Sequence, residues 1–324
     1  KTVQFEKEFA AKIGSRHVLA VNSGTSALIA SLVAAGVGPG DEVIVPAYTF
    51  FASVSAIIVA KAIPVITEIN ESLTIDPASI EKNITPRTKA IMPVHFGGRI
   101  CDMDRLNEIA ADHGVPIVED ACHAWGGRWE GRGAGTLGLC GIFSFQLSKN
   151  ITAGEGGAIV TDNAELAAMC RSITNCGRAA GAPWYHHVNA GTNARLTEFQ
   201  AALLSCQIKR LGEQTLTRER NAAILNSALE EIGGLIPQPG SNRITRRAYH
   251  LYCLRIDAEL FGCSRAQFVA AANAEGWPVG AGYPLPLYEQ PVFKDHPGRH
   301  GGGACPIVED LCYRSAMWFG HEKL

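Results

Sequence analysis

The sequence has 324 residues, and its 29 Lys and Arg against 31 Asp and Glu give a formal charge of −2, so there is no overall electrostatic reason to expect binding to nucleic acid or to an anionic membrane. Hydrophobic residues make up 47% and charged residues 19% of the chain, which predicts a folded protein rather than a disordered or fibrous one. The longest apolar runs, at residues 27–35 and 53–60, are shorter than the roughly 18–20 residues of a membrane-spanning helix.

The ten cysteines are scattered along the chain, and no two of them form a Cys-x-x-Cys pair. This spacing argues against a zinc ribbon or a redox motif, and most of the cysteines lie in apolar stretches. We therefore expect reduced core residues and a cytoplasmic protein. No signal-peptide pattern opens the sequence, and because Lys1 lies at the start of a helical pattern, further residues are expected before it.

Short β-branched runs alternate with helical patterns over the first two thirds of the chain. The sequence predicts strands at residues 42–45, 64–69, 90–95, 116–120, 141–146 and 157–162. It predicts helices at residues 3–13, 24–35, 50–61, 102–113 and 164–173, and Gly36 and Gly114 close two of them as left-handed caps. This alternation indicates an α/β fold in which helices cover a mostly parallel sheet.

The pattern changes after a long helix expected at residues 196–211. From about Thr217 onward the sequence predicts a further helix, a strand at 250–256, a helix at 264–275 and a Pro- and Gly-rich stretch at 276–303. We therefore expect a large domain at residues 1–216 and a smaller C-terminal α+β domain at residues 217–324.

A match to G-x-G-x-x-G at residues 133–138 lacks the context of a dinucleotide site. Such a site needs a strand before the glycines and a helix after them, whereas here a polar segment precedes them and a strand follows. We interpret this segment as a turn that leads into a strand. His186 and His187 are adjacent, so their side chains should point apart, and no third ligand is suitably spaced. We expect no metal site and favour a surface or interface role for the pair.

Ser23, Gly24 and Thr25 stand where a helix is expected to begin. The first turn of a helix has unpaired N–H groups and a positive dipole end, so a small glycine and two hydroxyl groups there can bind a phosphate. An ordinary serine cap of the helix is the alternative interpretation.

The expected strand at residues 116–120 ends in two acids, Glu119 and Asp120, where open α/β folds often carry functional groups. A carboxylate at this position can pair with a cationic ring nitrogen and keep it protonated. A structural ion pair is the alternative.

Lys149 follows another apolar strand and precedes the glycine-rich residues 154–157. This position predicts partial burial, which would lower the pKa of the amine toward the free base that a Schiff base requires. A phosphate-binding helix start, a carboxylate at a strand end and a partly buried lysine are together what pyridoxal 5′-phosphate (PLP) requires.

Several motifs occur in the same order as in a known protein family, and together they cover nearly the whole chain. The sequence from Phe5 to Arg314 resembles the DegT/DnrJ/EryC1/StrS family of PLP-dependent aminotransferases, whose fold is the type I, aspartate-aminotransferase-like arrangement. The matching segments are residues 22–27 (NSGTSA), 38–46 (GPGDEVIVP), 48–50 (YTF), 119–120 (ED), 144–149 (SFQLSK), 154–157 (GEGG) and 191–198 (GTNARLTE).

The resemblance implies a role for each matching residue. Lys149 would form the Schiff base with PLP, Asp120 would pair with the pyridine nitrogen, and Phe50 would stack on the ring. Asn193 would reach the phosphate bound by the neighbouring subunit, which implies a homodimer with shared active sites. The phosphate would be held by three small or hydroxyl-bearing residues: Gly24, Thr25 and Ser144.

Two residues depart from the pattern of members that act on nucleotide-linked keto sugars. Those members usually have Gln three residues after the aspartate and His three residues before the lysine, where this chain has His123 and Gln146. His123 is expected to contact the O3′ side of the cofactor, and Gln146 a substrate hydroxyl. Both differences resemble the branch of 3-amino-5-hydroxybenzoate synthases, which act on a carbocycle, as do residues 176–178, 185–187 and 191–196.

The resemblance implies ping-pong transfer of an amino group from glutamate or glutamine to a small keto acceptor, which would be a cyclic polyol, an aminoshikimate-type carbocycle or a sugar. A nucleotide-sugar aminotransferase is one alternative. A PLP-dependent sugar dehydratase is another, which Lys149 disfavours because those members resemble the pattern with His at the lysine position. A non-catalytic PLP-binding regulator is the third, and the complete set of lysine, aspartate and phosphate-binding residues disfavours it.

Overall fold

The central sheet is built from two hydrogen-bonded groups of strands in the computed structural model, which describes residues 1–294 and 315–318. One group has the order β1 (His17–Val21), β9 (Gly157–Thr161), β8 (Cys140–Ser144), β5 (Val118–Asp120), and the other has the order β3 (Ile63–Thr67), β2 (Glu42–Pro46), β4 (Thr88–Ile91). Two isolated parallel bridges, at residue pairs 91/117 and 94/120, join the groups. Among the described strands of this sheet only β9 runs against the others, so the expected mostly parallel sheet is confirmed.

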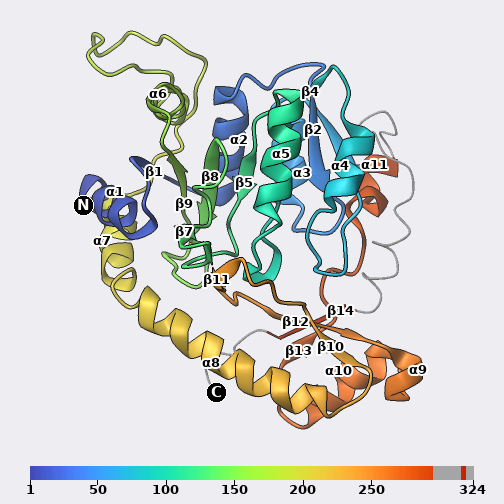
Figure 1. The fold of residues 1–324 in the computed structure, drawn as a ribbon. Helices are drawn as coiled ribbons and strands as arrows, with labels where there is room; N and C mark the ends of the chain where they lie inside the picture. The colour runs from blue at the N-terminus through green and yellow to red at the C-terminus, as the bar shows by residue number, and fades with distance from the viewer. Residues whose placement is uncertain (295–314, 319–324) are drawn as a thin grey trace.

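Helices cover both faces of this sheet. In β2, the side chains of Val43 and Val45 pack into one hydrophobic core and that of Ile44 packs into the other, because successive residues of a strand point to opposite faces. The first core includes side chains of α2 (Gly24–Ala34), α3 (Ala52–Val59) and α6 (Ala164–Thr174). The second includes side chains of α1 (Thr2–Ile13), α4 (Pro77–Asn83), α5 (Met103–His113) and α7 (Glu198–Gln207) (Figure 1).

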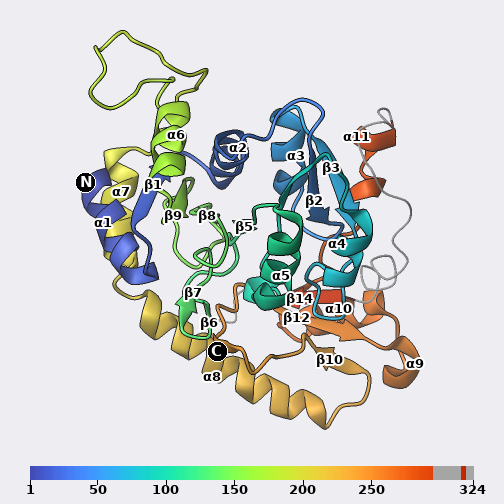
Figure 2. The same ribbon diagram turned by 45° about the horizontal axis from the view of Figure 1, so that its top comes forward.

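A second, antiparallel sheet forms the C-terminal α+β part, which confirms the expected character of this region. Its strands have the order β10 (Leu235–Pro237), β12 (Tyr252–Ile256), β14 (Ser315–Trp318), β13 (Val279–Gly280), and α9 (Ala258–Phe261) and α10 (Arg265–Ala274) lie beside it (Figure 2). The chain enters this part through α8 (Leu211–Glu230), which runs beside both parts of the molecule in both views (Figures 1 and 2). Since α8 continues without a break across Thr217, the domain boundary at this residue stays a prediction.

Shorter elements complete the described chain. The strands β6 (Arg128–Trp129) and β7 (Arg132–Gly133) pair with each other, and β11 (Ile244–Arg246) pairs with β6, which ties the segment after α8 to the large part. The 3-10 turns η1 (Phe96–Gly98) and η2 (Leu287–Glu289) and the helix α11 (Pro291–Lys294) are the remaining elements. No helix among the described residues is long and apolar enough to cross a membrane.

Several sequence predictions are wrong at their boundaries, and three of them are described here. The helix expected at 196–211 is two helices, since a turn at residues 208–210 separates α7 from α8, and the Gln207 side chain at the end of α7 bonds to both backbone groups of Thr152. The strand expected at 90–95 ends at residue 91 and the strand expected at 116–120 begins at residue 118, since Pro93 and Pro116 have no N–H to donate to a ladder. The Pro- and Gly-rich stretch expected at 276–303 lies partly outside the described residues. Arg314, where the resemblance ends, lies wholly outside them.

Candidate active site

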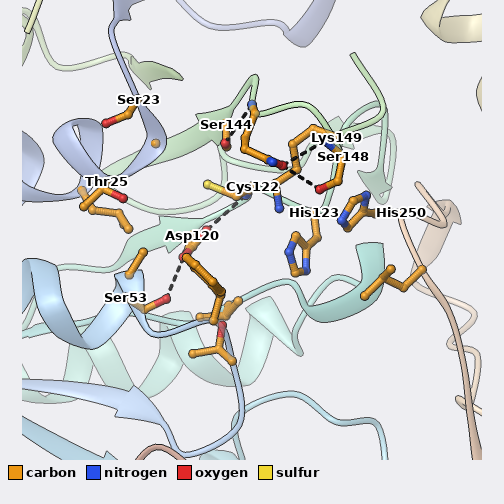
Figure 3. Close-up of a pocket in the computed structure, with 18 of the residues that line it drawn as sticks. Ser23, Thr25, Ser53, Asp120, Cys122, His123, Ser144, Ser148, Lys149 and His250 are labelled. Carbon is orange, nitrogen blue, oxygen red and sulfur yellow. Dashed lines mark hydrogen bonds between the residues drawn. The ribbon is translucent and has the colours of Figure 1, made fainter. Parts of the chain in front are cut away.

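A cavity of about 580 Å³ opens at the carboxyl ends of β5 and β8. The C-terminal part of the chain contributes His250, Tyr283 and Met317 to its wall. The structure thus brings together all of the cofactor-site residues expected from the sequence except Asn193: Gly24, Thr25, Phe50, Asp120, His123, Ser144 and Lys149. Figure 3 labels five of them: Thr25, Asp120, His123, Ser144 and Lys149.

Helix α2 begins at this cavity, and its first turn is open to a ligand. The Oγ of Ser23 accepts a hydrogen bond from the N–H of Ser26 at 3.0 Å, so the serine cap is present. This cap pairs only one of the N–H groups of the first turn, and Gly24 and Thr25 line the cavity. A Cβ at position 24 would lie 2.9 Å from the Cβ of Ser144, so glycine is needed for the helix to approach the end of β8. The resulting narrow space, with two hydroxyl groups beside backbone N–H groups, suits a phosphate.

Asp120 ends β5 and is only 5% exposed. Its Oδ2 accepts a hydrogen bond from the Oγ of Ser53 at 2.9 Å, and its Oδ1 accepts one from the N–H of Cys122 at 3.1 Å (Figure 3). Both donors are uncharged, so they orient the carboxylate without neutralising it. The arrangement therefore suits the partner of a cationic ligand group better than a structural ion pair.

The neighbouring Glu119 has a different, structural role. Its fully buried carboxylate pairs with the Nε2 of His95 at 2.9 Å. It also accepts hydrogen bonds at 2.6–2.7 Å from three backbone N–H groups, those of Gly135, Leu137 and Gly138. These bonds hold residues 133–138 in a turn that leads into β8, so the interpretation of the glycine-rich segment as a turn is confirmed.

Lys149 lies in the turn after β8, partly buried in the wall of the cavity. Its backbone N–H donates to the carbonyl of Gln146 at 2.9 Å. Burial lowers the pKa of the Lys149 amine below its ordinary value, and the carboxylate of Asp120 opposes this shift only in part. The predicted partial burial and lowered pKa are both confirmed.

His123 and Phe50 form other parts of the wall. The His123 ring is buried, which is the main reason that its pKa lies well below the ordinary value, and the charge of Lys149 adds to the effect. The imidazole is therefore neutral. Phe50 is 59% exposed and lies near the ring of Tyr283, with 6.4 Å between ring centroids, so its ring has an accessible face for stacking.

These groups fit PLP as a set. The space between the start of α2 and Ser144 suits the phosphate, the carboxylate of Asp120 suits a protonated ring nitrogen, and the Lys149 amine suits an aldehyde. All three line one cavity whose volume is in the range of small-molecule sites.

The family of the chain follows from comparison with known proteins. A model of the DegT/DnrJ/EryC1/StrS aminotransferase family matches residues 1–322. The chain belongs to this family. It is a PLP-dependent aminotransferase with small-molecule substrates and the type I fold of that family.

Individual relatives show how far the similarity extends. The aminotransferase is 40% identical to the spore coat polysaccharide biosynthesis protein SpsC of Bacillus subtilis (strain 168) over 305 residues, which cover 91% of this chain and 78% of the relative. It is 44% identical to 3-amino-5-hydroxybenzoate synthase of Amycolatopsis mediterranei (strain S699) over 258 residues, 78% of this chain and 66% of the relative. The crystal structure of a 3-amino-5-hydroxybenzoic acid synthase is also similar, with a TM-score of 0.91 at 37% identity, and the match covers 99% of this chain and 85% of that one.

Asn193 lies apart from the cavity of its own chain in the aminotransferase. It is exposed and pairs with Asn175 through an isolated bridge, beside the loop that extends from the body of the molecule after α6 (Figure 1). His186 and His187 lie exposed on this loop, and the Nδ1 of His187 is 2.6 Å from the carbonyl oxygen of Cys176. Among the described residues, no three His, Cys, Asp or Glu side chains are grouped so as to hold a metal ion.

Among the residues of the cavity wall that sequence reasoning missed are Ser53, His250 and Tyr283. Ser53 bonds directly to Asp120, and the other two come from segments about 100 residues or more after it. Ser53 follows the matching residues 48–50 by one helical turn, which was an available signal. No local pattern marks the other two, because only the packing of the C-terminal part brings them to the cavity.

The lowered pKa of Lys149 predicts how attachment of PLP depends on pH. Only the neutral amine attacks an aldehyde, so the attachment rate of the apoprotein should rise with pH as Lys149 loses its proton, and it should level off below pH 10.5. Stopped-flow absorbance of PLP mixed with apoprotein measures this rate. N-acetyl-lysine serves as the control for the titration of PLP itself, and a midpoint no lower than that of this control would contradict the prediction.

Proposed function

We propose that this aminotransferase moves an amino group from glutamate or glutamine to a ketone on a cyclic polyol, an aminoshikimate-type carbocycle or a sugar. The observation that supports the proposal is that the residues expected to bind PLP, apart from Asn193, line one cavity together with Gln146. Similarity to a 3-amino-5-hydroxybenzoate synthase over 78% of this chain supports a carbocyclic acceptor.

Different residues of this chain would have different roles in such a reaction. When bound, PLP supplies an aldehyde for an amine to attack and a pyridinium ring that withdraws electrons. The Nζ of Lys149 would attach the cofactor and, as a free amine, would carry the proton between the α-carbon of the substrate and C4′ of the cofactor. Its lowered pKa favours this role because the neutral amine is the base. Asp120 holds the proton on the ring nitrogen, and the start of α2 binds the phosphate with Ser144.

Gln146 faces the substrate side of the cavity in this proposal. Its Oε1 accepts hydrogen bonds from the N–H of Ser148 at 2.9 Å and from the Oγ of Ser148 at 2.7 Å. The oxygen end of the amide is thus engaged, and the NH₂ group is the end that can donate to a hydroxyl or carbonyl oxygen of the acceptor. A polyol or keto ring suits such a donor.

Three alternatives make different predictions. A nucleotide-sugar aminotransferase would need the diphosphate of its substrate to bind beside the same cavity. The relative SpsC is named for polysaccharide biosynthesis, which is why this alternative is tested. A sugar dehydratase would release water from its substrate, which Lys149 disfavours. A PLP-binding regulator would hold the cofactor without turnover.

A two-step spectroscopic experiment tests the proposal. Glutamate or glutamine is added to the PLP-loaded protein, and the loss of visible absorbance is followed as the amino group is taken up. A keto-cyclitol, a keto sugar and a nucleotide keto sugar are then added separately, and the return of that absorbance is measured. We expect the first two classes to restore it. Lack of response to either donor would favour the regulator, and restoration by the nucleotide sugar alone would favour the nucleotide-sugar aminotransferase. A product that has lost a hydroxyl group and gained no amino group would favour the dehydratase.

We also propose that the enzyme is a homodimer with shared active sites. Asn193 is exposed and does not line the cavity of its own chain. This is expected of a residue that contributes to the site of a partner subunit. Large apolar side chains on either side of it in the sequence are exposed as well, including Trp184 at 76% in the loop after α6 and Phe199 at 90% on α7. Exposed large apolar side chains such as these support an interface between subunits.

A mixture of two inactive variants should recover activity if the sites are shared. In a mixed dimer of Lys149→Ala and Asn193→Ala chains, one site has both residues intact and the other has neither. With random exchange half of the dimers are mixed, so about a quarter of the wild-type sites should return. Activity is measured after exchange, and exchange itself is followed with two affinity tags.

The matched control mixes Lys149→Ala with Asp120→Asn. Both of these residues line the cavity of the same chain, so every site in a mixed dimer lacks one of them and no activity should return. Recovery in this control, or none in the first mixture when Asn193→Ala alone is severely impaired, would contradict the shared site.

A cytoplasmic location is proposed from the cysteines. The cysteines of the described residues are free thiols, and several are buried in the hydrophobic cores. Cys305 and Cys312 lie outside the described residues. Free thiols support a reducing compartment.

A further inference from the structure

We propose that His250 is a positioning residue of this active site: oriented by Asn150, its ring packs on His123 and holds the Nε2–H of His123 toward bound PLP. This inference rests on the proposed function of the cavity. His250 lies in the C-terminal part of the chain, far in sequence from the motifs that indicate the cofactor, yet it lines the same cavity as Asp120 and Lys149 (Figure 3).

The backbone around His250 is held to the large part of the molecule from two sides. The N–H groups of Ala248 and Leu251 donate to carbonyl oxygens of residues 97–98 at 3.3 and 3.2 Å. On the other side, the Nδ2 of Asn150 donates to the carbonyl of Ala248 at 3.1 Å. Because Asn150 directly follows Lys149, the same contact ties the turn of the proposed catalytic lysine to the segment that carries His250.

The backbone just before His250 is strained. Tyr249 has a φ of 43°, in the left-handed region that a bulky residue rarely adopts. A Cβ at position 98 would lie 2.8 Å from the backbone nitrogen of Tyr249, so only glycine at Gly98 permits this close approach. Strain of this kind persists where surrounding contacts enforce it, and it is concentrated at functional sites. Here it directs His250 into the cavity.

The hydrogen bonds of Asn150 define the state of the His250 ring. Since the Nδ2 of Asn150 donates to a carbonyl, its Oδ1 is the acceptor that lies 3.1 Å from the Nδ1 of His250. The Nδ1 of His250 therefore carries a hydrogen, and this bond orients the ring.

His123 has the complementary state. Its Nδ1 accepts a hydrogen bond from the N–H of Gly97 at 3.4 Å, so in the neutral ring the hydrogen is on Nε2. The rings of His123 and His250 lie 4.5 Å apart between centroids, with 37° between their planes. This contact covers one face of the His123 ring and hinders a flip of the ring. Such a flip would put a carbon atom where the Nε2–H donor now lies.

An N–H donor on His123 is useful beside PLP, because the O3′ oxygen next to the aldehyde is anionic. A hydrogen bond to this oxygen strengthens binding of the cofactor and favours its anionic form. His250 does not need to touch the cofactor to affect both quantities. Its effect passes through His123, and this route is what an experiment can test.

The experiment measures PLP affinity of the apoprotein and the pH midpoint of the visible absorption band of the bound cofactor. We expect His250→Ala to raise the Kd for PLP about threefold to tenfold, as expected for one misaligned hydrogen bond, and to shift the pH midpoint upward. His250→Phe keeps a ring against His123 and should keep most of the affinity. In a His123→Gln background, His250→Ala should change neither quantity further, because the residue through which it acts is gone.

Each remaining outcome overturns the inference. Equal effects of His250→Ala in both backgrounds would show a merely structural role, and no effect in either would show no role. If His250→Ala does not fold, His250→Phe is compared with His250→Asn, which keeps an N–H for Asn150 but no ring, and a better performance of the Asn variant overturns the inference. Failure of the wild-type protein to bind PLP or to respond to an amino donor would instead overturn the proposed function.

Discussion

Replacing Lys149 with alanine is expected to abolish amino transfer and leave the fold intact. The change removes both the amine that attaches PLP and the base that moves the proton, and a positioned acid–base group alone contributes roughly 10²–10⁴-fold. Reduction with borohydride followed by mass spectrometry of peptides measures the attachment. Wild-type protein should gain the mass of reduced cofactor on the peptide that contains Lys149, and the variant should gain none.

The stability of the apoprotein provides a second readout of the same variant. The pKa of Lys149 is lowered by burial, so the folded chain binds its proton less readily than the unfolded chain does. This residue therefore reduces stability at neutral pH, and its penalty disappears as pH rises toward the ordinary lysine value. Because removal of this charge removes a penalty, we expect the melting temperature of the Lys149→Ala apoprotein at neutral pH to be no lower than that of the wild type.

A matched lysine variant separates loss of attachment from loss of charge. Lys89 is exposed on β4, away from the cavity, and Lys89→Ala should keep both trapping and activity. Added methylamine should restore part of the rate to Lys149→Ala, since a free amine can replace the missing base. Trapping at full yield in Lys149→Ala would show that another lysine attaches the cofactor.

The part of the site that the sequence predicts consists of residues at the ends of buried strands. Strands β5 and β8 are buried on both faces, so they read as apolar runs, and Asp120 and Ser144 mark where those runs end. Parallel strands bring their carboxyl ends to one edge of a sheet, which places these residues and Lys149 together without knowledge of the full fold. The helix start at Gly24 was predicted differently, from a small residue and hydroxyl groups at the beginning of an apolar helical pattern.

Among the elements of the large part that were missed, β1 and α4 were missed for different reasons. Strand β1 is a short apolar run, His17–Val21, that pairs with β9 about 140 residues later, and its pattern was overlooked between two predicted helices. Helix α4 did have a signal, because Asp76 accepts a hydrogen bond from the N–H of Ala78 and Pro77 is its first residue. A cap followed by proline predicts a helix start, and this pair was overlooked.

The sequence could not predict His250 in the site, because its position depends on contacts between distant segments. The bonds from residues 97–98 and from Asn150 reach it across about 150 and 100 residues, and the left-handed backbone at Tyr249 has no signature in residue type. Asn193 is the opposite case. Resemblance to the family implies that it binds a phosphate, but it lies outside the cavity of its own chain. Its proposed role therefore depends on the proposed homodimer.

Asp120→Asn is expected to bind PLP but to lose most of the half-reaction rate. The phosphate-binding residues are unchanged, and an amide of the same shape can keep contacts to Ser53 and Cys122. The negative charge that keeps the ring nitrogen protonated is lost, and removal of one such preorganised electrostatic contact costs roughly 10²–10³-fold in rate. Stopped-flow absorbance after addition of glutamate measures this rate, and titration with PLP measures the affinity.

Two comparisons separate the charge of Asp120 from its structural contacts. Ser53→Ala removes the 2.9 Å hydrogen bond to Oδ2 but keeps the charge, so its rate should fall only about threefold to tenfold. N-methyl-PLP carries a permanent positive charge on the ring nitrogen and needs no carboxylate to hold a proton there, so it should restore part of the rate to Asp120→Asn. If instead Asp120→Asn keeps its rate and loses only stability, the carboxylate is structural, and the pairing of Asp120 with the ring nitrogen is wrong.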